Sequence, residues 1–140
     1  LDGANIEIFD QVGEDNIVIF GLSANEVLNY NKFGGYSALD LYNSNRVIKR
    51  VVDDLVNGFI PNMEKEGRQI YDSLITYNDE YFVLRDMENY IEAQEKIDRL
   101  YKNKEKWNEM ALINIANSGV FSSDRTIAEY AEDIWFKGCE

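Results

Sequence analysis

The residue types that most often perform catalysis are scarce in this chain. Its 140 residues contain no histidine, which removes the commonest general base, the usual Ser-His and Cys-His pairs and the commonest zinc ligand. The one cysteine, Cys139, can build neither a zinc site by itself nor a disulfide within the chain. The glycines form neither GxGxxG nor GxxxxGK[ST], the loops that cradle phosphates. We therefore expect no catalytic residue and no metal site among these residues.

Carboxylates are the one reactive group present in quantity. There are 26 acidic and 14 basic residues, which gives a net charge of -12. Pairs such as Glu129 and Asp133 lie four residues apart, a spacing typical of a solvent-facing helix surface. So acidic a surface repels phosphate backbones and anionic lipid, which argues against nucleic acid and membranes as partners. No apolar run approaches the roughly 20 residues that span a bilayer, and the cytoplasm is the expected compartment.

Two short segments lie where a site could form. Residues 2–5 (DGAN) would join a strand ending at Leu1 to a helix beginning at about Asn5, and ligands of open α/β sheets gather beyond the ends of strands. We interpret Asp2 or Asn5 first as the cap of that helix, in preference to a residue of a site. Residues 122–126 (SSDRT) would start a helix that attracts an anion, but the carboxylate of Asp124 would occupy that field. We interpret the second segment as a cap, with Arg125 bridging to a carboxylate or a carbonyl.

The strongest strand pattern covers residues 16–21 (NIVIFG). Its consecutive apolar and mostly β-branched residues are typical of a strand covered on both faces, as in a parallel sheet. Residues 81–84 (YFVL) are a weaker candidate, and Leu1 could be the stub of another. Because a buried strand without neighbours leaves its N–H and C=O groups unpaired, the pattern indicates a piece of a larger α/β domain.

The remaining residues predict helices within a single domain, 1–140, without an internal boundary. Ser23 and Glu26 have the spacing of a capping box. A stripe of apolar residues after Asn45 predicts a helix that ends at Gly58. The expected N-caps are Ser23, Ser37, Asn45, Asp86, Asn103 and Ser122 or Ser123.

Several motifs, in order, resemble the last part of an α-glucan phosphorylase of the glycogen/maltodextrin phosphorylase family. Residues 1–7 (LDGANIE) and 121–135 (FSSDRTIAEYAEDIW) match family motifs at the two ends. Between them, residues 14–21 (EDNIVIFG) resemble GEEN.FIFG, residues 57–59 (NGF) match NGF or SGF, and residues 90–101 resemble a Y…QE…LY block.

The resemblance implies a fold, a reaction and a cofactor. The fold is α/β by parentage: a GT-B-type enzyme with two Rossmann-like domains, of which this chain forms the end of the second. The chain itself is then expected to be mainly α-helical, with one or two parallel strands. Family members cleave terminal α-1,4-glucosidic bonds of an α-glucan with inorganic phosphate and release glucose 1-phosphate. Their cofactor is pyridoxal phosphate, whose phosphate group acts as the acid and base.

The family's cofactor lysine lies in an EASGTGNMK motif shortly before LDGAN, and this chain begins after that motif. We therefore expect neither bound cofactor nor activity from these residues alone. Under this interpretation Asp2, Gly3 and Asn5 could support the cofactor lysine from its C-terminal side. The alternative function is a free-standing acidic helical module for interaction or regulation. An exposed strand edge at Ile17–Phe20 could also pair two copies into a homo-oligomer.

Overall fold

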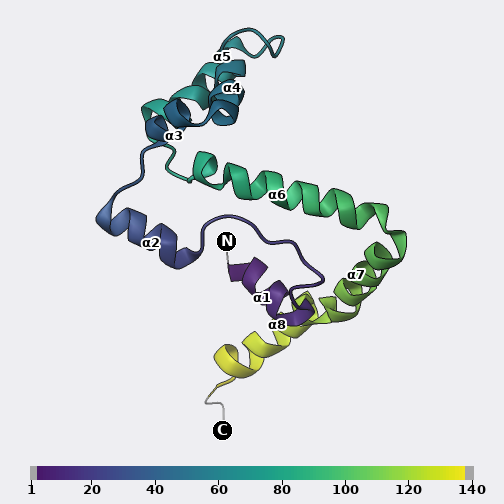
Figure 1. Ribbon diagram of the computed structural model, residues 1–140. Coiled ribbons are helices and arrows are strands. Elements are labelled where there is room, and N and C mark those ends of the chain that lie inside the picture. Colours follow the sequence, from purple (N-terminus) through teal and green to yellow (C-terminus); the bar gives the residue numbers. More distant parts are fainter. Residues whose placement is uncertain (1–2, 138–140) are drawn as a thin grey trace. The chain divides into compact units, whose positions relative to one another are not determined.

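The computed structural model describes residues 3–137, and the regular elements in that range are all helices (Figure 1). The predicted mainly helical character is therefore confirmed. The α-helices are α1 (Gly3–Val12), α2 (Ala24–Phe33), α3 (Ala38–Ser44), α4 (Arg46–Asp54), α5 (Glu64–Tyr71), α6 (Val83–Lys102), α7 (Lys104–Asn117) and α8 (Ser123–Tyr130). A turn of π-helix follows α5 at Asp72–Thr76 and α8 at Ala131–Trp135, and a 3₁₀ turn at Ser118–Phe121 separates α7 from α8.

The described residues divide into two compact units. Unit 1 comprises residues 19–95 and contains α2 to α5 with most of α6. Unit 2 comprises residues 3–18 and 96–137 and contains α1, the end of α6, α7 and α8. The expectation that residues 1–140 form a single portion without an internal boundary stays a prediction.

Unit 1 is built on a small apolar core. Ala38 of α3, Ile48 and Val52 of α4, and Leu84 of α6 are all at most 3% exposed. The apolar stripe on α4 is only half used for this core, because Val47 and Val51 remain 54% and 44% exposed. Part of the apolar surface of α4 therefore stays outside the packed core of the unit.

The predicted parallel strands are not present in the described residues. Residues 17–20 form no regular structure, and Tyr81 lies in a turn just before α6 begins at Val83; Leu1 lies outside the described range. A strand exists only when a neighbour pairs with its backbone, and residues 3–137 provide no such neighbour. The strand edge through which two copies were expected to pair is therefore absent from the described residues. Self-association itself stays a prediction.

Most predicted helix starts are confirmed by side-chain hydrogen bonds. The capping box is complete: Ser23 Oγ accepts from the Glu26 amide, and a Glu26 carboxylate oxygen accepts from the Ser23 amide. The other confirmed caps are Ser37, Asn45, Asn103 and Ser122. The predicted end of α4 at Gly58 is wrong, because the helix ends at Asp54, although Gly58 does adopt a φ of +84°.

Asp86 does not cap α6, contrary to the sequence prediction. The helix begins three residues earlier, at Val83, so Asp86 lies in its first turn. Its Oδ1 instead accepts a hydrogen bond of 2.9 Å from the amide of Leu22. Gly21 allows this approach, because its φ is +87° and a Cβ atom there would lie 2.6 Å from Asp86 Oδ2. Asp86 thus anchors Leu22, two residues before α2 begins, to α6.

Candidate functional site

The candidate segment at the N-terminus lies at the beginning of α1. Gly3 is the first helical residue and Asn5 lies in the first turn, two residues after the helix begins. Asp2 lies outside the described residues. A supporting role for Asp2, Gly3 and Asn5 toward a cofactor lysine therefore stays a prediction.

A buried carboxylate that the sequence analysis did not single out organises unit 1. Asp79 is 2% exposed, and it is the one buried charged side chain among the described residues. Its carboxylate accepts hydrogen bonds from the hydroxyl of Tyr36 at 2.7 Å and from the amides of Val83 at 2.9 Å and Leu84 at 2.7 Å. Those amides are the first two of α6, so Asp79 performs the capping that was predicted for Asp86.

The neighbouring residue Asn78 ties α3 to the same place. Its Oδ1 accepts from the amide of Ala38 at 2.8 Å, and its Nδ2 donates to the carbonyl oxygen of Tyr36 at 3.3 Å. The pair Asn78-Asp79 therefore joins the starts of two helices that are far apart in sequence. All the described hydrogen bonds of the Asp79 carboxylate serve that joint between α3 and α6.

Burial raises the pKa of the Tyr36 hydroxyl, and the hydrogen bond to Asp79 raises it further. The folded state therefore keeps a proton that the unfolded chain releases at about pH 10. The contribution to stability is complete below that pH and is lost as the pH rises above it. We expect the urea midpoint of the chain to fall more steeply above pH 10 than that of a Tyr36→Phe variant. Equal slopes for the two proteins would contradict this prediction.

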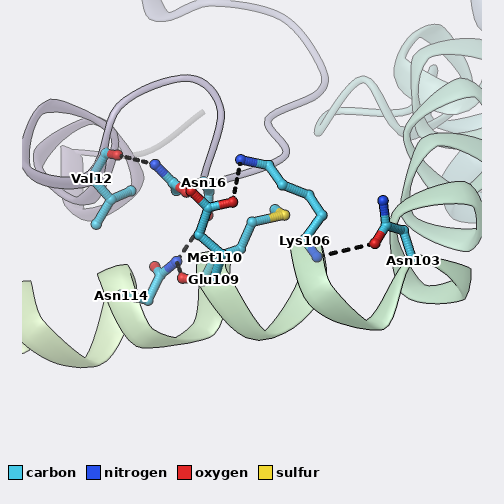
Figure 2. A network of polar contacts seen from close by, with 7 residues as sticks. All are labelled: Val12, Asn16, Asn103, Lys106, Glu109, Met110 and Asn114. Carbon is cyan, nitrogen blue, oxygen red and sulfur yellow. Dashed lines mark hydrogen bonds and ion pairs between the residues drawn. The ribbon is translucent and has the colours of Figure 1, made fainter.

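A second polar cluster holds unit 2 together (Figure 2). Asn114 of α7 donates through Nδ2 to the carbonyl oxygens of Asn16 and Met110, both at 2.8 Å. Asn16 in turn donates through its own Nδ2 to the carbonyl oxygen of Val12 at 2.7 Å, which closes the end of α1. The Asn16 Oδ1 atom is buried and has no hydrogen-bond partner among the described residues. The cluster fastens the turn after α1 to α7.

We expect an Asn114→Ala variant to loosen this attachment, because the Asn16 carbonyl loses its donor 98 residues away in sequence. The cost should be about 1–2 kcal/mol. Amide hydrogen exchange of residues 13–18 measures it directly. Asn117→Ala is the matched control, since Asn117 Nδ2 donates to the Ile113 carbonyl one turn back in the same helix, at 2.8 Å. Equal effects of both substitutions on residues 13–18 would contradict the role of Asn114.

Arg125 and Thr126, the last two residues of the segment 122–126, line a hollow of about 480 Å³ between α1 and α8. The predicted bridge of Arg125 is confirmed, because its guanidinium donates to the carbonyl oxygen of Val120 and pairs with Glu129 at 2.6 Å. Glu7 and Asp10 of α1 line the opposite wall. Among the described residues that line the hollow, the one cation is already paired and three carboxylates are present, which disfavours an anionic ligand.

The expected absence of a bound cofactor from these residues stays a prediction. One way to activate a lysine for Schiff-base formation is to desolvate its amine in an apolar pocket. The described lysines are exposed apart from the half-buried Lys106, whose ammonium pairs with Glu109 at 3.1 Å. Residues 3–137 also contain no cluster of three or more His, Cys, Asp or Glu arranged to hold a metal ion. In this same range, none of the helices is both long enough and apolar enough to cross a membrane.

Comparison with known proteins shows the family. The chain matches the family model of carbohydrate phosphorylases over residues 1–137, so it belongs to that family. It is 53% identical over 134 residues to a glycogen phosphorylase of Bacillus subtilis (strain 168), which covers 96% of this chain and 17% of that protein. It is 44% identical to a glycogen phosphorylase of Synechocystis and 41% identical to the liver form from Homo sapiens, covering 96% of this chain and 16% of each relative. The chain thus spans about one sixth of the length of these relatives.

Proposed function

We propose that these residues are the C-terminal part of the catalytic domain of an α-glucan phosphorylase with a GT-B-type fold. That enzyme cleaves terminal α-1,4-glucosidic bonds with inorganic phosphate and releases glucose 1-phosphate in the cytoplasm. The family match over residues 1–137 carries the proposal. The names of the relatives, all glycogen phosphorylases, support an α-glucan as the substrate.

The role of this part is to close the domain by packing, not to carry out the reaction. The chain exposes 10550 Å² of surface. Two separate compact bodies, each with half of its 16.2 kDa, would together expose only about 9,000 Å². Large apolar side chains contribute to the excess, and among the most exposed are Phe33, Phe59, Leu112, Ile115, Ile134 and Phe136. Such surfaces are typical of helices that pack against further protein.

The cofactor chemistry belongs to residues outside this chain. When bound, pyridoxal phosphate supplies the acid and base through its phosphate group, so a segment without histidine can belong to this enzyme. The residues described here hold helices in place: Asp79 and Asn78 join α3 to α6, and Asn114 joins α7 to the turn after α1.

We expect the isolated 140-residue chain neither to acquire the absorbance of a cofactor Schiff base nor to release glucose 1-phosphate from maltodextrin. The whole protein encoded by the gene should do both under the same conditions. Release of glucose 1-phosphate by the isolated chain would contradict the assignment of the chemistry to other residues. A whole gene product without phosphorolysis would instead favour a free-standing interaction module.

A further inference from the structure

Unit 1 contains an apolar cavity of about 450 Å³ that its own residues leave open. The walls reach the core, because Val52 and Leu84 line the cavity and are 0% and 3% exposed. The rim comes from separate segments of the chain: Phe20, Val51 and Tyr81 are 44%, 44% and 78% exposed. The cavity is therefore an opening into the hydrophobic core rather than a flat apolar patch.

The rim is held in shape by contacts that are already made within the unit. The ring of Phe20 packs edge-on against Tyr90 of α6 with 5.2 Å between the ring centroids. Among the described residues, the Asp86 carboxylate is the one charged group that lines the cavity, and it accepts a hydrogen bond from the amide of Leu22. An incoming group thus meets a preformed apolar wall without a free cation or a free metal ligand. This chemistry fits neutral apolar side chains and disfavours sugars and phosphates.

We propose that this cavity is a socket for apolar side chains of the same polypeptide, supplied by a part of the phosphorylase that lies outside these 140 residues. The inference rests on the proposed function and names the contact through which unit 1 joins the rest of the enzyme. The relatives are about six times as long as this chain. In a protein of that length, most of the polypeptide lies outside these residues and can supply the segment that fills the cavity. A segment of the same polypeptide is present at an effective concentration near the millimolar range, well above that of a second copy in dilute solution.

Cysteine labelling in the full-length protein tests the socket. Val51→Cys and Tyr81→Cys place a thiol on the rim, from α4 and from the turn before α6. Val47→Cys is the matched control, since Val47 lies on the same helix, is 54% exposed and does not line the cavity. The rate of maleimide labelling at each position is measured by peptide mass spectrometry in native buffer and in urea, at two protein concentrations.

If the socket is filled, Cys labelling at positions 51 and 81 is slowed by roughly 100-fold relative to urea, at both protein concentrations, while position 47 is slowed less than about tenfold. Labelling at 51 and 81 as fast as at 47 overturns the proposal, because the socket is then open. Protection that disappears on dilution also overturns it, since the occupant is then a second copy. Protection at 47 equal to that at 51 and 81 also overturns it, because the labelling then reports a general covering of this surface and does not single out the cavity. Phosphorolysis by the unmodified protein is assayed in parallel, so an open socket in an active enzyme leaves the proposed function intact.

Discussion

An Asp79→Ala variant is expected to lose about 3 kcal/mol of the stability of unit 1. The substitution removes one carboxylate and leaves three donors without their acceptor: the Tyr36 hydroxyl and the amides of Val83 and Leu84. Since Leu84 is 3% exposed, water cannot readily replace the lost acceptor at its amide. Hydrogen–deuterium exchange of the Val83 and Leu84 amides measures the local loss, and urea unfolding of the chain measures the global one.

The control for this variant is another carboxylate that accepts from a tyrosine. Asp53 accepts a hydrogen bond of 2.5 Å from the Tyr42 hydroxyl, but its side chain is 40% exposed and it caps no helix start. Asp53→Ala should therefore cost less than about 1 kcal/mol. Asp79→Asn retains an acceptor oxygen and should fall between the two. If Asp79→Ala is no worse than Asp53→Ala, the joint between α3 and α6 does not depend on this carboxylate.

The second large effect is expected at Gly67, a buried residue in the middle of α5. A Cβ atom at this position would overlap the backbone carbonyl of Leu55, at the end of α4. Alanine normally favours a helix over glycine by about 1 kcal/mol, but here the backbones of α4 and α5 must move apart. We expect Gly67→Ala to reduce the free energy of unfolding by about 2–3 kcal/mol.

Urea unfolding and hydrogen exchange of the α5 amides measure the effect of Gly67→Ala. Gly119→Ala serves as its control, because a Cβ atom at Gly119 would lie in open space. This control should change stability by no more than about 0.5 kcal/mol. A Gly67→Ala chain as stable as the unsubstituted one, with unchanged exchange in α5, would show that the two helices can separate without cost.

Local patterns in the sequence determined most of the helix starts and the family. The capping bonds of Ser23, Asn103 and Ser122 join residues three positions apart, so the chemistry of a cap can be read from a few neighbouring letters. The family follows from the order of several motifs, and the match over residues 1–137 confirms it. The ion pair of Arg125 with Glu129 can likewise be predicted from the local sequence, because the two residues lie one helical turn apart.

The tertiary structure decided whatever depends on partners distant in sequence. Both Asp79 and Asp86 precede apolar residues at helical spacing, and only the fold shows which of them caps α6 and which holds Leu22, 64 residues away. Gly67 is an ordinary helical glycine until the carbonyl of Leu55 lies against it. Residues 16–21 have a strand composition, yet a strand also needs a neighbouring backbone, and no residue in the range 3–137 supplies one. Composition sets the preference of a segment for extension, whereas pairing is a property of two segments.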